Sequence, residues 1–284
     1  MSVKEEISRR TFVKTSVTAG IGVAAVSSAS AQAPAMEMNV NITTPDGTCD
    51  CAFIHPPTGA HAAVIIWPDA FGLRGSMRDM AKRLAAEGYS VLVPNPYYRV
   101  QKAPFVESAE NFNFNDPAQR GKLTPLMGSI GAAGAAEKDA AAFVAWLDRQ
   151  SAVDRTKKIG TQGYCMGGPL IVRTAAALPD RIGAAASFHG GGLVTPAPDS
   201  PHKLAPKIKA RMYFGVAQND DMQQPTAKTE LKAAFDAAKV PAEVEVYPAQ
   251  HGWCVPDMPG GIYNRAEAEK AWTKLLALYK AGLA

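Results

Sequence analysis

Three residues far apart in the chain have the types and the order of a nucleophile, an acid and a base. Cys165 stands in the run GYCMGG, where an apolar strand-like segment gives way to a helix-like one. Asp220 and Asp221 follow a second strand-like segment, and His251 follows a third. A histidine can take the thiol proton while an aspartate orients the imidazole. We therefore predict that His251 activates Cys165, with Asp220 as the acid and Asp221 as its alternative.

The glycines around Cys165 indicate why a lone cysteine stands there. Gly163 and Gly167 lie two residues before and after it, the spacing of a sharp strand-to-helix turn that presents a nucleophile. Side chains at these positions would collide as the backbone folds back. The amides at the start of the next helix favour a thiolate. The alternative is a small residue in a structural turn; the aspartate and histidine downstream favour the chemical interpretation.

The elements that must position these residues alternate between strand and helix from about residue 36. Such alternation predicts an α/β fold, with a mostly parallel sheet covered by helices on both faces. Reactive groups gather at the carboxyl ends of the strands in such sheets. The segment 97–128 has no clear periodicity, and we expect a lid or a pocket wall there. We expect a hairpin over 38–56 turning at 45–47, strands within 61–72, 89–98, 157–165, 182–190, 210–220 and 242–250, and helices over 76–88, 132–150, 167–179, 226–239 and 265–282.

The run GYCMGG resembles the G-x-C-x-G-G signature of the dienelactone hydrolases, which are cysteine enzymes of the α/β-hydrolase fold. The segment 214–220 resembles that family's F-G-x-x-x-x-D stretch, and the run HGW at 251–253 resembles its His-Gly-aromatic ending. The resemblance covers nearly all of the chain after residue 33. It implies the α/β-hydrolase fold, a small-molecule ester or lactone as substrate, and no cofactor.

The resemblance also implies a mechanism. Cys165 would attack the ester or lactone carbonyl to form an acyl-thioester, which water activated by His251 would then release. The backbone amides of Met166 and Ala70 would hold the oxyanion, each contributing about 3–4 kcal/mol of transition-state stabilisation.

Two more positions resemble functional residues of the family. Asp69 stands where the family has an acidic residue, usually glutamate, that contacts the resting thiol, but its side chain is one methylene shorter. Arg99 stands where an arginine pairs with the substrate carboxylate. The family's type enzyme has a second such arginine soon after the histidine, and this chain has none there. Arg74 is either its substitute or, as we expect, a solvated surface charge.

The remaining cysteines and one histidine have less specific interpretations. Cys49 and Cys51 lie two apart on one expected strand, where a disulfide would be strained, so we interpret them as ordinary strand residues. Cys254 is expected to be a packed cysteine, with a second reactive thiol as the alternative. His189 either lines the pocket or is a hydrogen-bonded structural histidine.

Residues 1–33 resemble a twin-arginine export signal. The run SRRTFVK at 8–14 precedes a weakly apolar stretch, and AQA at 31–33 offers a small-x-small cleavage site. The apolar stretch is too short and too rich in serine and threonine to span a bilayer, so we expect no stable membrane span. We predict the twin-arginine translocase as a partner during export, a periplasmic location, and one hydrolase domain over 34–284.

Charge and cysteine spacing exclude other classes of protein. The formal net charge is +4, and residues 1–33 hold four basic and two acidic side chains, so no basic run remains to bind nucleic acid. The four cysteines form neither a CxxC pair nor a cluster with histidine, so we expect no metal and no dithiol redox chemistry. Two alternatives stay open: hydrolysis of another acyl bond, such as a thioester or a peptide, and a non-catalytic ligand-binding protein of this fold.

Overall fold

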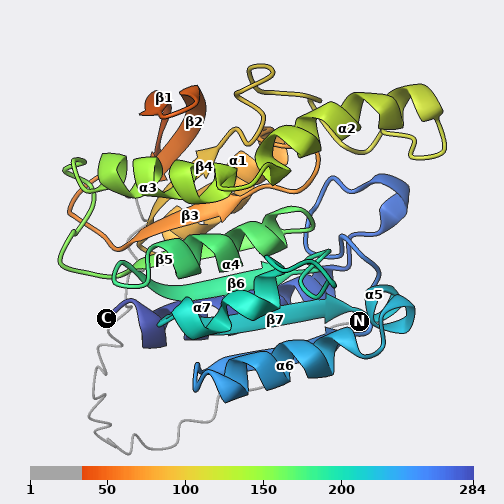
Figure 1. Ribbon diagram of the computed structural model, residues 1–284. Helices are drawn as coiled ribbons and strands as arrows, with labels where there is room; N and C mark the ends of the chain where they lie inside the picture. The colour runs from red at the N-terminus through yellow and green to blue at the C-terminus, as the bar shows by residue number, and fades with distance from the viewer. Residues whose placement is uncertain (1–33) are drawn as a thin grey trace, which may run out of the picture. The chain divides into compact units, whose positions relative to one another are not determined.

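The computed structural model describes residues 34–284, so the predicted export signal lies outside the described residues. The described chain forms one eight-stranded sheet in the order β1-β2-β4-β3-β5-β6-β7-β8 (Figure 1). β1 pairs with β2 and β2 with β4 in antiparallel fashion, and every other pair is parallel. The mostly parallel α/β sheet is thereby confirmed. The strands are β1 (Met36–Thr44), β2 (Gly47–His55), β3 (Ala63–Trp67), β4 (Ser90–Pro94), β5 (Ile159–Tyr164), β6 (Ile182–Phe188), β7 (Arg211–Ala217) and β8 (Ala242–Tyr247).

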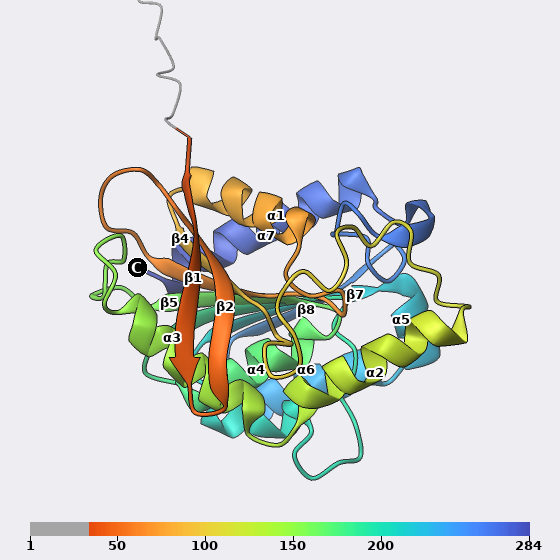
Figure 2. The same cartoon turned by 90° about the horizontal axis from the view of Figure 1, so that it is seen from above.

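Helices cover both faces of the sheet. Seen from above, α1 and α7 lie on one face, and α3, α4 and α6 lie on the other (Figure 2). Each layer closes its own apolar core, one against α1 and α7 and one against α3, α4 and α6. Within 34–284, none of the helices has both the length and the apolar character needed to cross a membrane. The helices are α1 (Gly75–Ala86), α2 (Pro117–Gly131), α3 (Ala135–Leu147), α4 (Gly167–Ala177), α5 (Gln218–Gln223), α6 (Ala227–Ala237) and α7 (Arg265–Gly282), with 3₁₀ turns at Pro201–Lys207 and Pro259–Gly261.

The central strands are buried along their whole length because both of their faces are covered. Every residue of β3, β4 and β5 is buried. This is the expected pattern for parallel strands between two helical layers. The predicted hairpin is confirmed, with its turn between Thr44 and Gly47.

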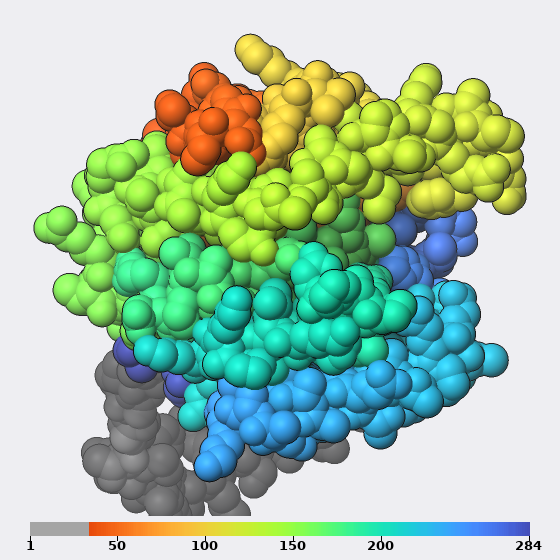
Figure 3. Space-filling model, viewed as in Figure 1, coloured from red at the N-terminus to blue at the C-terminus, as the bar shows by residue number. Residues whose placement is uncertain are grey.

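The segment 97–128, where the sequence shows no clear periodicity, contains most of α2, and its role as a lid or a pocket wall stays a prediction. Asp116 caps this helix by accepting a hydrogen bond from the amide of Ala118, and Pro117 occupies the first turn. Gly121 and Pro125 interrupt the apolar pattern inside the helix, so no helical period is visible. The Asp-Pro pair is the feature of the sequence that indicates the start of this helix. Figure 3 shows α2 projecting beyond the rest of the domain, at the edge where the parallel strands end.

Candidate active site

Cys165 lies at the bend between β5 and α4, with its side chain partly exposed. Its φ of 51° is a left-handed conformation that residues other than glycine rarely adopt. The Cys165 amide donates to the carbonyl of Phe188 at 3.1 Å and to Nδ1 of His189 at 3.1 Å. The strained residue is therefore anchored to the end of β6.

Three close contacts explain why the sequence has glycine around this bend. A Cβ on Gly163 would lie 2.2 Å from the carbonyl oxygen of Gly167. A Cβ on Gly167 would lie 2.3 Å from the carbonyl oxygen of Trp67, and one on Gly168 would lie 2.5 Å from Cα of Gly190. All three distances join a side-chain carbon to backbone atoms, which cannot move aside as a flexible side chain would. The turn therefore requires glycine at each position.

His251 and Asp220 form a direct contact at the same edge of the sheet. Nδ1 of His251 lies 2.7 Å from Oδ2 of Asp220, and the amide of His251 donates to Oδ1 of Asn219 at 2.8 Å. Asp221 instead accepts a hydrogen bond from Lys228 at 2.7 Å. The structure thus pairs the histidine with Asp220, which lies in the short helix α5 and not at the tip of β7.

The histidine also interacts with the thiol. Burial of the His251 ring, which by itself lowers its pKa, is outweighed by hydrogen bonds to Asp220 and Cys165, and the pKa rises to about 10. Since Nδ1 is occupied by Asp220, Nε2 is the nitrogen left to face the sulfur. Cys165, Asp220 and His251 therefore lie near one another, in the segments that follow β5, β7 and β8.

Of the two interpretations of His189, the structure supports that of a buried structural histidine. Its ring lies edge-on to that of His251, with the centroids 4.8 Å apart. Burial and then the nearby charge of His251 hold the pKa of His189 well below its ordinary value. Its Nδ1 accepts the Cys165 amide proton, so the ring is neutral and supports the bend.

The two amides predicted to hold an oxyanion are free of internal partners. Among residues 34–284, neither the Met166 nor the Ala70 amide donates a hydrogen bond to a protein acceptor. Tyr97, which the sequence analysis did not single out, connects them. Its hydroxyl donates to the Ala70 carbonyl at 2.7 Å and lies 3.5 Å from Sδ of Met166. The tyrosine fixes the loop after β3 against the bend after β5.

Asp69 and Arg74 are placed differently from our expectations. Arg74 is fully buried, so the interpretation as a solvated surface charge is wrong. Its guanidinium bridges Asp69, at 2.8 and 3.0 Å, and Asp257, at 2.7 and 2.7 Å. Asp257 also accepts from the amide of Ala109. Both oxygens of Asp69 thus accept hydrogen bonds from Arg74, and the predicted contact of Asp69 with the thiol stays a prediction.

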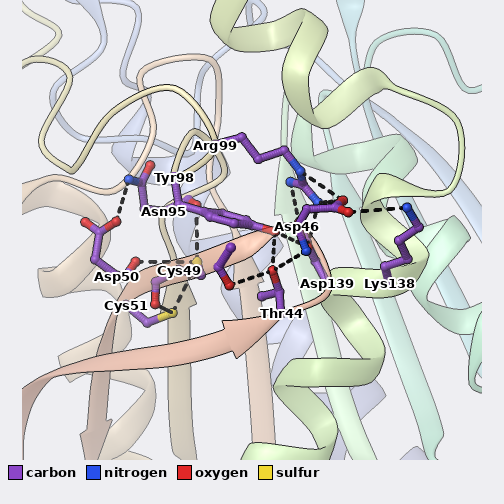
Figure 4. A network of polar contacts seen from close by, with 11 residues as sticks. Thr44, Asp46, Cys49, Asp50, Cys51, Asn95, Tyr98, Arg99, Lys138 and Asp139 are labelled. Carbon is purple, nitrogen blue, oxygen red and sulfur yellow. Dashed lines mark hydrogen bonds and ion pairs between the residues drawn. The ribbon is translucent and has the colours of Figure 1, made fainter.

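Arg99 lies in a second network of acidic groups, between the β1–β2 turn and α3 (Figure 4). It contacts both oxygens of Asp139 at 2.8 Å and Oδ2 of Asp46 at 2.8 Å. Asp139 also accepts from the Tyr98 hydroxyl, which in turn contacts Thr44. The interpretation of Arg99 as a free carboxylate-binding group is at odds with this arrangement, because two carboxylates of the chain itself already hold it.

The other cysteines are buried and free. Cys49 and Cys51 lie side by side on β2, with their sulfur atoms 3.5 Å apart, and Cys49 also contacts the carbonyl of Asn95 at 3.4 Å. Burial raises the pKa of the Cys49 and Cys254 thiols, which disfavours the reactive thiolate. Among the described residues, no three His, Cys, Asp or Glu side chains are grouped as a metal site would require.

The fold and the placement of the site define the class. A largely parallel sheet with helices on both faces, and with these residues after β5, β7 and β8, is the α/β-hydrolase fold. The model of the dienelactone hydrolase family matches residues 51–283, and the chain belongs to that family.

Individual relatives agree with this assignment. A Synechocystis protein named "Putative carboxymethylenebutenolidase" is 30% identical over 232 residues, which are 79% of this chain and 88% of that one. The dienelactone hydrolase of Anabaena variabilis has a TM-score of 0.60 at 16% identity, over 88% of this chain and all of that one. A dienelactone hydrolase-like promiscuous phosphotriesterase from metagenomic libraries has a TM-score of 0.70 at 21% identity, over 88% of this chain and all of that one. At such identities the two structures support the fold alone.

Proposed function

We propose that the protein hydrolyses carboxylic esters or lactones, with Cys165 as nucleophile, His251 as base and Asp220 as the group that orients the base. Two observations carry this proposal: Asp220 contacts His251 at 2.7 Å, and interaction with Cys165 contributes to the raised pKa of His251. Family membership supports a hydrolase, and the similarity to proteins named carboxymethylenebutenolidases supports an ester or lactone substrate.

The reaction would proceed in two halves. Nε2 of His251 takes the proton of Cys165, and the thiolate attacks the carbonyl carbon. The tetrahedral intermediate collapses to an acyl-thioester, and His251 returns the proton to the leaving alkoxide. Water then gives a proton to His251 and attacks the thioester. The thiolate leaves, the acid is released as product, and Cys165 takes the proton back from His251. Asp220 stays ionised and stabilises the imidazolium in both halves.

The free amides of Met166 and Ala70 would hold the oxyanion in both tetrahedral intermediates. Each such donor contributes about 3–4 kcal/mol to transition-state stabilisation. Tyr97 would keep the second amide in place through its bond to the Ala70 carbonyl. Its role is positional, because its hydroxyl is directed at the loop itself.

An ester panel with a nucleophile variant tests the proposal. The purified protein should hydrolyse small aryl esters, with a burst of one acyl group per chain if release of the thioester is slow. Cys165→Ala should remove both the burst and the turnover. Iodoacetamide should inactivate the protein with labelling at Cys165 alone, because the other described cysteines are buried. Stoichiometric labelling that leaves ester hydrolysis intact would refute the assignment and favour a non-catalytic binding protein.

The same residues could cleave another acyl bond. Thioesters and peptides need the same nucleophile, base and oxyanion hole, and differ in the leaving group that His251 must protonate. Including both classes in the panel decides between them. A kcat/KM for thioesters or peptides well above that for esters would replace the ester assignment while leaving the triad in place.

We further propose that residues 1–33 direct export to the periplasm through the twin-arginine translocase. The run SRRTFVK supports this proposal. Replacing Arg9 and Arg10 with lysine should retain the full-length chain in the cytoplasmic fraction. Unchanged export of that variant would refute the route.

A further inference from the structure

Both arginines that the sequence offered as partners for a substrate carboxylate are held by acidic residues of the chain itself. Arg74 lies between Asp69 and Asp257, and Arg99 lies between Asp46 and Asp139. In the sequence analysis, Arg99 stands at the carboxylate-binding position of the family and Arg74 is the possible substitute for a second such arginine. Their surroundings therefore bear on which substrates the site accepts.

The hydrogen bonds of Arg74 leave no donor for a ligand. A guanidinium has five N–H groups. In Arg74, Nε donates to Asp257, one terminal nitrogen donates to Asp69 and the Gly72 carbonyl, and the other donates to Asp69 and Asp257. All five donors are used, and the side chain is fully buried. A substrate carboxylate could bind Arg74 only by displacing an internal carboxylate.

Arg99 is nearly as fully occupied. Its three nitrogens make four contacts with Asp46 and Asp139, and Asp46 also contacts the ammonium of Lys138 at 3.4 Å. The four charges of this network cancel. It therefore offers no net positive charge to a substrate.

The charge balance at Arg74 is equally unfavourable for an anion. With both carboxylates ionised, the group formed by Asp69, Arg74 and Asp257 carries one negative charge, and with one of them protonated it carries none. In a buried setting, water and salt screen such charges little. An approaching carboxylate would be repelled or, at best, not attracted, and it would lose its hydration on entering.

Most of the other residues that line the pocket beside Asp220 are apolar. A small pocket beside Asp220 is lined by Leu193, Val194, Val216 and Leu231. The only lysine that lines this pocket, Lys228, is bound to Asp221.

We infer that the site takes uncharged esters or lactones and discriminates against substrates that carry a carboxylate. This inference rests on the proposed function and narrows its substrate class. The exposed Arg120 and Lys122 on α2 do not alter it, because solvent screens charges on an exposed helix face.

A matched pair of substrates tests the inference. Methyl 4-nitrophenyl adipate is neutral, and mono-4-nitrophenyl adipate has the same chain ending in a carboxylate. At pH 7.5, with the uncatalysed rate subtracted, we expect kcat/KM for the acid to be at least about tenfold lower. Equal or faster hydrolysis of the acid overturns the inference and leaves the proposed function standing. Failure to hydrolyse either ester, or equal hydrolysis by Cys165→Ala, counts against the proposed function itself.

Charge variants test whether the internal carboxylates cause this discrimination against the charged ester. Asp257→Asn removes one of the two carboxylates that hold Arg74, so the acid-to-neutral ratio of kcat/KM should rise several-fold. Asp180→Asn makes the same change in net charge on an exposed residue at the opposite end of the strands, and the ratio should not move. An equal ratio in both variants would refute the role of the paired Arg74. If Asp257→Asn does not fold, Asp46→Asn provides the corresponding measurement at Arg99.

Discussion

Replacing Gly163 with alanine tests the geometry of the bend most directly. The new Cβ would lie 2.2 Å from the carbonyl oxygen of Gly167, and ordinary contacts of this kind begin at 3.4 Å. Backbone on one side of the bend must therefore move by about 1 Å. Overpacking of this size costs about 1–3 kcal/mol of folding stability. A shift of about 1 Å at a reacting group can reduce the rate about 100-fold.

The assay combines urea unfolding with ester hydrolysis. We expect Gly163→Ala to lower the free energy of unfolding by about 1–3 kcal/mol and kcat/KM by about 100-fold. Gly128→Ala is the matched control, because a Cβ at that position in α2 meets no atom within 4 Å. It should gain up to about 1 kcal/mol from helix propensity and keep its activity. If Gly163→Ala retains wild-type stability and rate, the bend is not the constraint described here.

Three further predictions concern the charged groups. Asp220→Asn should reduce kcat/KM by up to about 10⁴-fold, because the wrong tautomer of His251 would face the thiol, whereas Asp221→Asn should have little effect; equal losses would contradict the pairing. Arg99→Ala should cost about 3–5 kcal/mol in urea unfolding, since it leaves the buried Asp139 without its cation, with little change in hydrolysis of neutral esters. The pKa of His251 is raised to about 10, so its contribution to stability should be complete below about pH 6.5 and should disappear as the pH rises towards 10. The difference in unfolding free energy between wild type and His251→Gln, measured across that range, should decline; a constant difference would contradict it.

Much of the fold and of the candidate triad could be predicted from the sequence, because both follow from local sequence patterns. Continuous apolar runs indicate buried parallel strands, and the glycine spacing around Cys165 indicates a sharp turn. The order of Cys165, Asp220 and His251 indicates a common edge of the sheet. These features depend on a few neighbouring residues and on the topology rules of α/β sheets.

The roles of the arginines could not be predicted, because they depend on residues far away in the sequence. Arg74 is separated from Asp257 by 183 positions, and Arg99 from Asp46 by 53. No short motif records such pairs. Position in the family pattern therefore indicated a ligand for Arg99 only, whereas the structure shows that carboxylates of the same chain hold both arginines.

The bridge formed by Asp69, Arg74 and Asp257 also constrains how this protein could be redesigned. It ties together the loop after β3, the segment before α2 and the loop that carries the histidine. A chimera that imports one of these loops without the matching residue would leave hydrogen-bonding groups of this bridge without a partner in the interior. Loop exchange here should succeed only when all three segments are taken from the same donor.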